Sequence, residues 1–126
     1  MKSLPPYAEL LKLGTETHDG VMRFVMPFHD DVVGRPGFLH GGAIAGLLEF
    51  AAFTALEHAL GDEPVTKKPV TVTVDYMRGG VDHDTYASAV VTRLGTRVAN
   101  VEAHAWQQDR ARPIASAQMN VMLKRR

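Results

Sequence analysis

The chain contains no cysteine, which removes disulfide bonds, thiolate nucleophiles and cysteine-ligated zinc from its possible chemistry. A reducing, cytoplasmic setting is therefore expected. Net charge is absent as well, because 14 Lys and Arg balance 14 Asp and Glu, so no global positive field favours nucleic-acid binding. The two halves of the chain differ in charge, however: residues 1–63 carry four basic and nine acidic side chains, whereas residues 64–126 carry ten basic and five acidic ones.

Uninterrupted apolar runs and metal-binding motifs are also missing. Pro5 and Pro6 break the N-terminal stretch, and the longest apolar segment, residues 43–60, contains Glu49 and Glu57. Neither export nor a membrane span is expected. The six histidines form no HExxH motif or tight cluster, and no GxSxG or GxxxxGK[ST] motif occurs. We therefore expect no metal site.

The 126 residues, of which 45% are apolar and 22% charged, are typical of one globular domain. A short N-terminal helix is predicted over residues 3–13, with Ser3 as a possible cap, followed by a core over residues 15–126. Alternating side chains predict a strand over residues 21–28. Four of the eleven glycines lie in residues 30–42, which therefore form a shaped loop.

A long helix is predicted over residues 43–60. Apolar residues recur at spacings of three and four, namely Ile44, Leu47, Leu48, Ala51 and Ala55. Phe50 and Phe53 widen this stripe until the helix is apolar on almost every side, so other elements should surround it. About 60 residues of single-layer sheet cannot cover such a helix completely, which favours a partner subunit.

Runs of β-branched and apolar residues predict four further strands, over residues 70–78, 86–94, 97–107 and 114–123. The short connections between them require antiparallel pairing, because parallel strands need long crossovers. The predicted class is α+β, with a long central helix wrapped by an antiparallel sheet of five or six strands.

Glu49 is the only ionisable residue between residues 43 and 56. A carboxylate in such apolar surroundings needs a partner or a chemical role as a base or nucleophile. Alternatively, it lies on the one solvent-exposed edge of the helix.

Gly41 and Gly42 stand where this helix should begin, and bare N–H groups at a helix N-terminus can bind a developing oxyanion. Alternatively, the two glycines merely turn the loop into the helix, and His40 is an orienting residue. Gly42 and Glu49 are seven residues apart, about 10.5 Å along a helix. One helix cannot bring both to one small reacting group, so a homodimer with shared sites is expected.

The segment Gly37-Phe38-Leu39-His40-Gly41-Gly42, followed after four residues by Leu47-Leu48-Glu49, resembles the GxxHGGxxxxLx[DE] signature of hotdog-fold acyl-CoA thioesterases of the phenylacetate-pathway type. The resemblance extends from about residue 15 to 123 and implies the hotdog fold. It also implies that the Gly41 N–H polarises the thioester carbonyl, with Gly42 beside it, and that His40 shapes the turn. Glu49 of the partner subunit would act as base or nucleophile, and coenzyme A is part of the substrate rather than a cofactor.

The resemblance also suggests substrate-binding positions. Relatives often carry Asn or Gln six residues before the histidine, where this chain has Gly34 followed by Arg35. They often place Ser or Thr one turn after the acid, where this chain has Phe53 followed by Thr54. The acyl pocket is further predicted to include Phe38, Phe50, Tyr76 and Met77. Among the basic side chains of the second half, Arg97 is the best candidate for docking the phosphates of coenzyme A.

The leading hypothesis is a cytoplasmic acyl-CoA thioesterase for aryl or medium-chain acyl groups, acting as a homodimer or a dimer of dimers (a homotetramer). The first alternative is a non-catalytic acyl-CoA or lipid-binding hotdog module, suggested by Gly34 and Phe53. The second is a hotdog dehydratase or hydratase, whose constellation with a catalytic histidine fits the spacing here less well.

Overall fold

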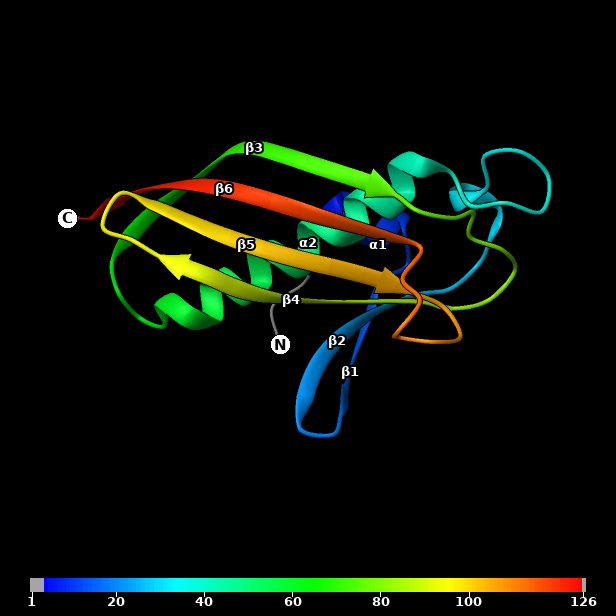
Figure 1. Cartoon of the computed structure of the whole chain (residues 1–126), viewed down its shortest axis with the longest axis horizontal. Coiled ribbons are helices and arrows are strands. Elements are labelled where there is room, and N and C mark those ends of the chain that lie inside the picture. Colours follow the sequence, from blue (N-terminus) through cyan, green and yellow to red (C-terminus); the bar gives the residue numbers. More distant parts are fainter. Residues whose placement is uncertain (1–3, 126) are drawn as a thin grey trace.

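The computed structural model describes residues 4–125. Six antiparallel strands form one sheet in the order β1-β2-β4-β5-β6-β3, and this sheet curves around the long helix α2 (Figure 1). The elements are α1 (Pro6–Leu10), β1 (Gly14–His18), β2 (Val21–Met26), the 3-10 helix η1 (Asp30–Val32), α2 (Gly41–Leu60), β3 (Val65–Tyr76), β4 (Thr85–Leu94), β5 (Val98–Trp106) and β6 (Ala115–Arg125). This arrangement is the hotdog fold expected from the sequence.

The helix α2 begins and ends where the residue chemistry requires. His40, in an extended conformation, is its N-cap, and Gly61 ends it with a positive φ of 59° that glycine adopts readily. By length and composition α2 is apolar enough to cross a membrane, but half of that stretch is buried inside the fold. Its apolar side chains thus form the core with the concave face of the sheet.

The strands pack against α2 through alternate residues. In β5 and β6 every second side chain is buried, and many of these are alanines, including Ala99, Ala103, Ala105, Ala115 and Ala117. Side chains this small allow the sheet to approach the helix closely. The opposite face of these strands carries polar side chains such as those of Asn100 and Asn120, which hydrogen-bond to each other at 2.6 Å.

The N-terminal region differs from the prediction. The helix spans only Pro6–Leu10, with Pro5 in place of Ser3 at the N-cap; Ser3 lies outside the described residues. The core begins at Gly14, because a strand that the sequence reading missed, β1, pairs with β2 in a hairpin. Asp19 and Gly20 form its turn with φ values of 52° and 78°, as the Asp-Gly pair of a two-residue hairpin requires.

The edge strand β3 is longer than predicted. It starts at Val65 rather than Val70, and its register against β6 shifts between Pro69 and Thr71. Proline donates no N–H to a sheet ladder, which is why it occurs on edge strands and at bulges. The other edge of β3 has no strand partner within residues 4–125, and Val70, Tyr76 and the adjoining Met77 are exposed there.

Candidate functional site

The first turn of α2 leaves one backbone donor without an acceptor. The Gly42 N–H donates to His40 Nδ1 at 2.8 Å, and the N–H groups of Ala43 and Ile44 donate to the His40 carbonyl at 3.0 and 3.2 Å. Only the Gly41 N–H of this turn has no acceptor among residues 4–125. Because the helix dipole adds partial positive charge here, this N–H can receive a developing negative charge.

The capping position of His40 limits the size of the side chain at Gly42 and at Gly34. Its Nδ1 accepts the Gly42 N–H, so in the neutral ring the proton lies on Nε2. A Cβ on Gly42 would lie 2.9 Å from His40 Nδ1, so any larger residue there would force the capping ring to shift. A Cβ on Gly34 would lie 3.1 Å from the Cα of His40, so the loop leaves little room for the amide side chain that relatives often carry at that position.

Hydrogen bonds hold the loop before α2 against the core. The His40 N–H donates to the Val32 carbonyl at 2.7 Å, and the Leu39 N–H donates to the Gly80 carbonyl at 3.0 Å. From β3, the Tyr76 hydroxyl donates to the Gly41 carbonyl at 2.8 Å. The Gly41 N–H is therefore presented by a turn that β3 and the β3–β4 connection fix in place.

Glu49 lies on an exposed face of α2, two turns beyond the glycines. In the single chain, the carboxylate is therefore at the solvent edge rather than buried among its apolar neighbours. It borders a mainly apolar cavity of about 200 Å³, called here the Glu49 cavity. The other lining residues are Tyr7, Phe50, Phe53, Pro69 and Met119.

Some of the other predicted site residues lie at the Glu49 cavity, and others lie near the start of α2. Phe50 and Phe53 line the Glu49 cavity, whereas Thr54 is half-buried and does not. Near the start of α2, the Arg35 guanidinium lies 4.6 Å from the ring centroid of Phe38. Exposed Met77 follows Tyr76, and neither lines the cavity.

Arg97 is far from this region within one chain. It lies between β4 and β5, at the end of the sheet opposite the start of α2 (Figure 1). Its role in docking the phosphates of coenzyme A stays a prediction. The sequence reading also missed Tyr7, which reaches the Glu49 cavity from α1 and which no motif indicated.

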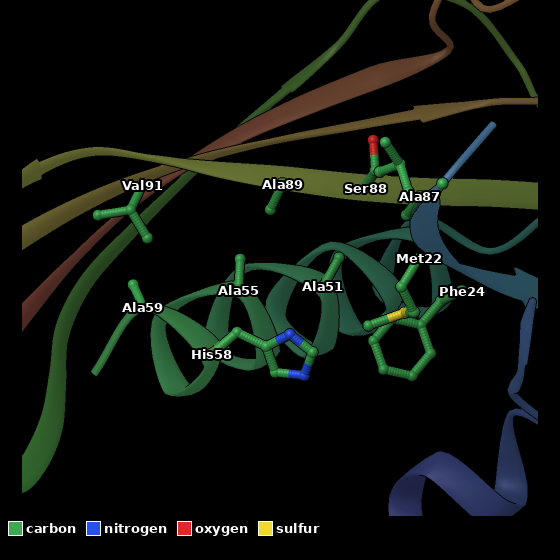
Figure 2. A pocket seen from close by; sticks show the side chains of 12 residues that line it. Met22, Phe24, Ala51, Ala55, His58, Ala59, Ala87, Ser88, Ala89 and Val91 are labelled. Carbon is green, nitrogen blue, oxygen red and sulfur yellow. The ribbon is translucent and has the colours of Figure 1, made fainter. Parts of the chain in front are cut away.

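A second cavity, of about 400 Å³, lies between the second half of α2 and β4. We call it the alanine cavity, because it is lined mainly by small side chains: Ala51, Ala55, Ala59, Ala87 and Ala89. Figure 2 shows Ala89 and Val91 pointing from β4 toward α2, and Ser88 pointing away. His58 is nine residues from Glu49, which is about 180° around the helix, so the two cavities lie on different sides of α2.

The profile of the thioesterase superfamily matches residues 36–114, which include the glycine turn, α2 and β3 to β5. The chain belongs to the thioesterase superfamily. This finding confirms the resemblance seen in the sequence. No protein with a curated functional description matches the chain.

Solved structures that are similar to this chain have the same fold. A protein from Chromobacterium violaceum is 34% identical, with 94% of this chain and 83% of that one covered and a TM-score of 0.72. A Bacillus halodurans protein solved with CoA has a TM-score of 0.87 at 18% identity, covering 100% and 83%. A phenylacetic acid degradation-related protein from Ralstonia eutropha has a TM-score of 0.81 at 18% identity, covering 96% and 92%.

Proposed function

We propose that this member of the thioesterase superfamily hydrolyses acyl-CoA thioesters, with aryl or medium-chain acyl groups as substrates. The observation that carries the proposal is the Gly41 N–H, which is the one donor in the first turn of α2 without an acceptor among residues 4–125. Coenzyme A as the carrier is supported by the Bacillus halodurans neighbour, which was solved with CoA.

The chemistry follows from these two groups. The Gly41 N–H donates to the thioester oxygen and stabilises the negative charge that develops when the carbonyl is attacked. The Glu49 carboxylate either takes a proton from an attacking water or attacks the carbon itself. As a base, Glu49 takes a proton from the water whose oxygen bonds to the carbon, and it returns that proton to the coenzyme A sulfur as the C–S bond breaks. As a nucleophile, its oxygen bonds to the carbon and forms a mixed anhydride while the thiolate leaves and takes a proton from water; a second water then cleaves the anhydride, releases the acid and restores the carboxylate.

A complete site in this proposal needs two copies of the chain. Gly42 and Glu49 are separated by about 10.5 Å of helix rise, so the Glu49 that serves one Gly41 belongs to the partner subunit. The open edge of β3 supports this assembly, because it exposes apolar side chains beside unpaired backbone groups. Pairing of two such dimers stays a prediction.

The test is Glu49→Gln, assayed on a panel of aryl-, short-, medium- and long-chain acyl-CoA. We expect kcat to fall by about 10²–10⁴-fold, because the amide accepts no proton from water and is a poor nucleophile. The melting temperature should hardly change, since the side chain is exposed. The matched control is Glu57→Gln, an exposed glutamate on the same helix, which should retain full activity.

A non-catalytic acyl-CoA-binding module is the alternative function. It is favoured by Gly34 and Phe53, where this chain lacks the amide and hydroxyl groups that often accompany catalysis in related proteins. Tight binding of several acyl-CoA species with no hydrolysis of any would support this alternative and contradict the proposed enzyme.

A further inference from the structure

Tyr7 reaches the Glu49 cavity from a short helix that the core holds firmly. Ala8 and Leu11 at the α1 end of the chain are buried, and His29 Nε2 lies 3.1 Å from the Leu11 carbonyl oxygen. Tyr7, by contrast, is 45% exposed. The backbone of α1 is therefore anchored while one side of the Tyr7 ring faces open space.

The other side of the ring lies along two turns of α2. The Tyr7 hydroxyl donates to the Gly42 carbonyl at 3.4 Å, and the Tyr7 and Phe50 ring centroids are 6.3 Å apart. Gly46, midway between these contacts, makes this position possible, because a Cβ there would lie 2.6 Å from Tyr7 Cε2. The ring thus spans the stretch of α2 that separates the glycine turn from Glu49.

Tyr7 differs from the other residues around the Glu49 cavity in its origin. Phe50 and Phe53 belong to α2, and Pro69 and Met119 to the sheet, so the core fixes these four positions. Only Tyr7 comes from outside the helix and sheet. Its side chain can therefore change the size of the cavity without changing the fold around Glu49.

We propose that Tyr7 closes the Glu49 cavity at one end and thereby limits the length of the acyl group that the site accepts. This inference rests on the proposed function, because it takes the cavity beside the carboxylate as the acyl pocket. A cavity of about 200 Å³ with an aromatic end wall selects compact acyl groups, aryl or medium-chain, over long ones. Tyr7 acts here on specificity, with no part in the bond-breaking step.

The test measures binding of S-alkyl-CoA thioethers, which cannot be hydrolysed, with alkyl chains from hexyl to dodecyl. In the wild-type protein, the gain in affinity per methylene, about fourfold where the methylene is buried, should stop once the cavity is full. In Tyr7→Ala the gain should continue to longer chains and raise dodecyl affinity relative to hexyl by about tenfold or more. Tyr7→Trp should shift the limit toward shorter chains.

Two control variants distinguish the effect of the Tyr7 ring from that of changing α1 elsewhere and from that of removing the hydroxyl group. Leu10→Ala changes a residue of α1 that is 49% exposed, close to Tyr7 in exposure, but lies outside the cavity lining, so it should keep the wild-type limit. Tyr7→Phe keeps the ring and should keep the limit as well. If Tyr7→Ala does not fold, Tyr7→Leu and Tyr7→Trp alter the same wall while retaining apolar packing on Gly46.

An unchanged chain-length profile in Tyr7→Ala (or Tyr7→Leu) and in Tyr7→Trp would overturn the inference, and so would an equal shift in Leu10→Ala. Since binding is measured on thioethers, this result does not depend on turnover. Absence of thioester hydrolysis by the wild-type protein would instead contradict the proposed function alone.

Discussion

The two cavities beside α2 differ in size and in chemistry, and the larger one has the less reactive lining. The alanine cavity has about 400 Å³, and its only side chains with polar groups are His58 and Ser88. The Glu49 cavity has about 200 Å³ and contains a carboxylate. Volume alone would favour the alanine cavity as the binding site, whereas the position of the carboxylate favours the other.

The cavities also arise differently. The strand β2 pairs with β4 only from Thr85 to Ala87, so within residues 4–125 the rest of β4 has no strand partner on that side, and small side chains leave a gap above α2. The Glu49 cavity instead lies where α2 is covered by α1 and the edge strand β3, and that edge is open to a partner. The alanine cavity is therefore a gap in packing, whereas the Glu49 cavity, on the same helix, is proposed to be completed by a partner subunit.

A large effect, close to that of Glu49→Gln, is expected from Gly41→Pro, which removes the N–H proposed to stabilise the negative charge on the thioester oxygen. Proline is well tolerated at the first position of a helix, and the extended His40 before it, with φ −71° and ψ 133°, suits a following proline. We expect kcat to fall by about 10²–10³-fold. Gly41→Ala is the matched control, because it keeps the N–H and its Cβ would meet Tyr76 at an ordinary 3.5 Å. Equal activity in both variants would show that this N–H has no role.

The next effect concerns assembly. Co-expressing Gly41→Pro and Glu49→Gln chains with different tags allows heterodimers to be purified. If the partner's Glu49 completes the site, each heterodimer has one intact site of two and should show about half of the wild-type activity. If Gly41 and Glu49 of the same chain worked together, every site would be damaged and the heterodimer would be as inactive as its parents.

Much of the fold could be predicted from the sequence, because the signals were local. The spacing of apolar residues located α2, and His40-Gly41-Gly42 located its first turn. The hairpin at Asp19-Gly20 carried a local signal too, but it joins a strand of exposed polar residues, β1, that shows no apolar alternation. The predicted start of β3, residue 70, is five residues late, because the strand continues through Pro69, a residue that is uncommon inside strands.

The site was harder to predict, because it depends on contacts between distant residues. Two positions for Glu49 are compatible with the sequence, one among apolar groups and one at a solvent-exposed edge, and its exposure depends on which side of α2 the sheet leaves open. Tyr7 meets α2 through Gly46, a contact across 39 positions that no periodicity records. Arg97 lies in a turn whose distance from His40 is set by the length of β5.

The smallest effect should come from filling the alanine cavity with Ala55→Leu. Leucine costs little helix propensity relative to alanine and would bury additional apolar surface, so the melting temperature should rise by about 2–4 °C, corresponding to less than about 1 kcal/mol. The kcat/KM for acyl-CoA should not change, because Ala55 faces the side of α2 away from Glu49. The matched change on the other side, Phe53→Trp, should lower kcat/KM for bulky acyl groups. A loss of activity in Ala55→Leu with an unchanged melting temperature would mean that the two cavities act as one site.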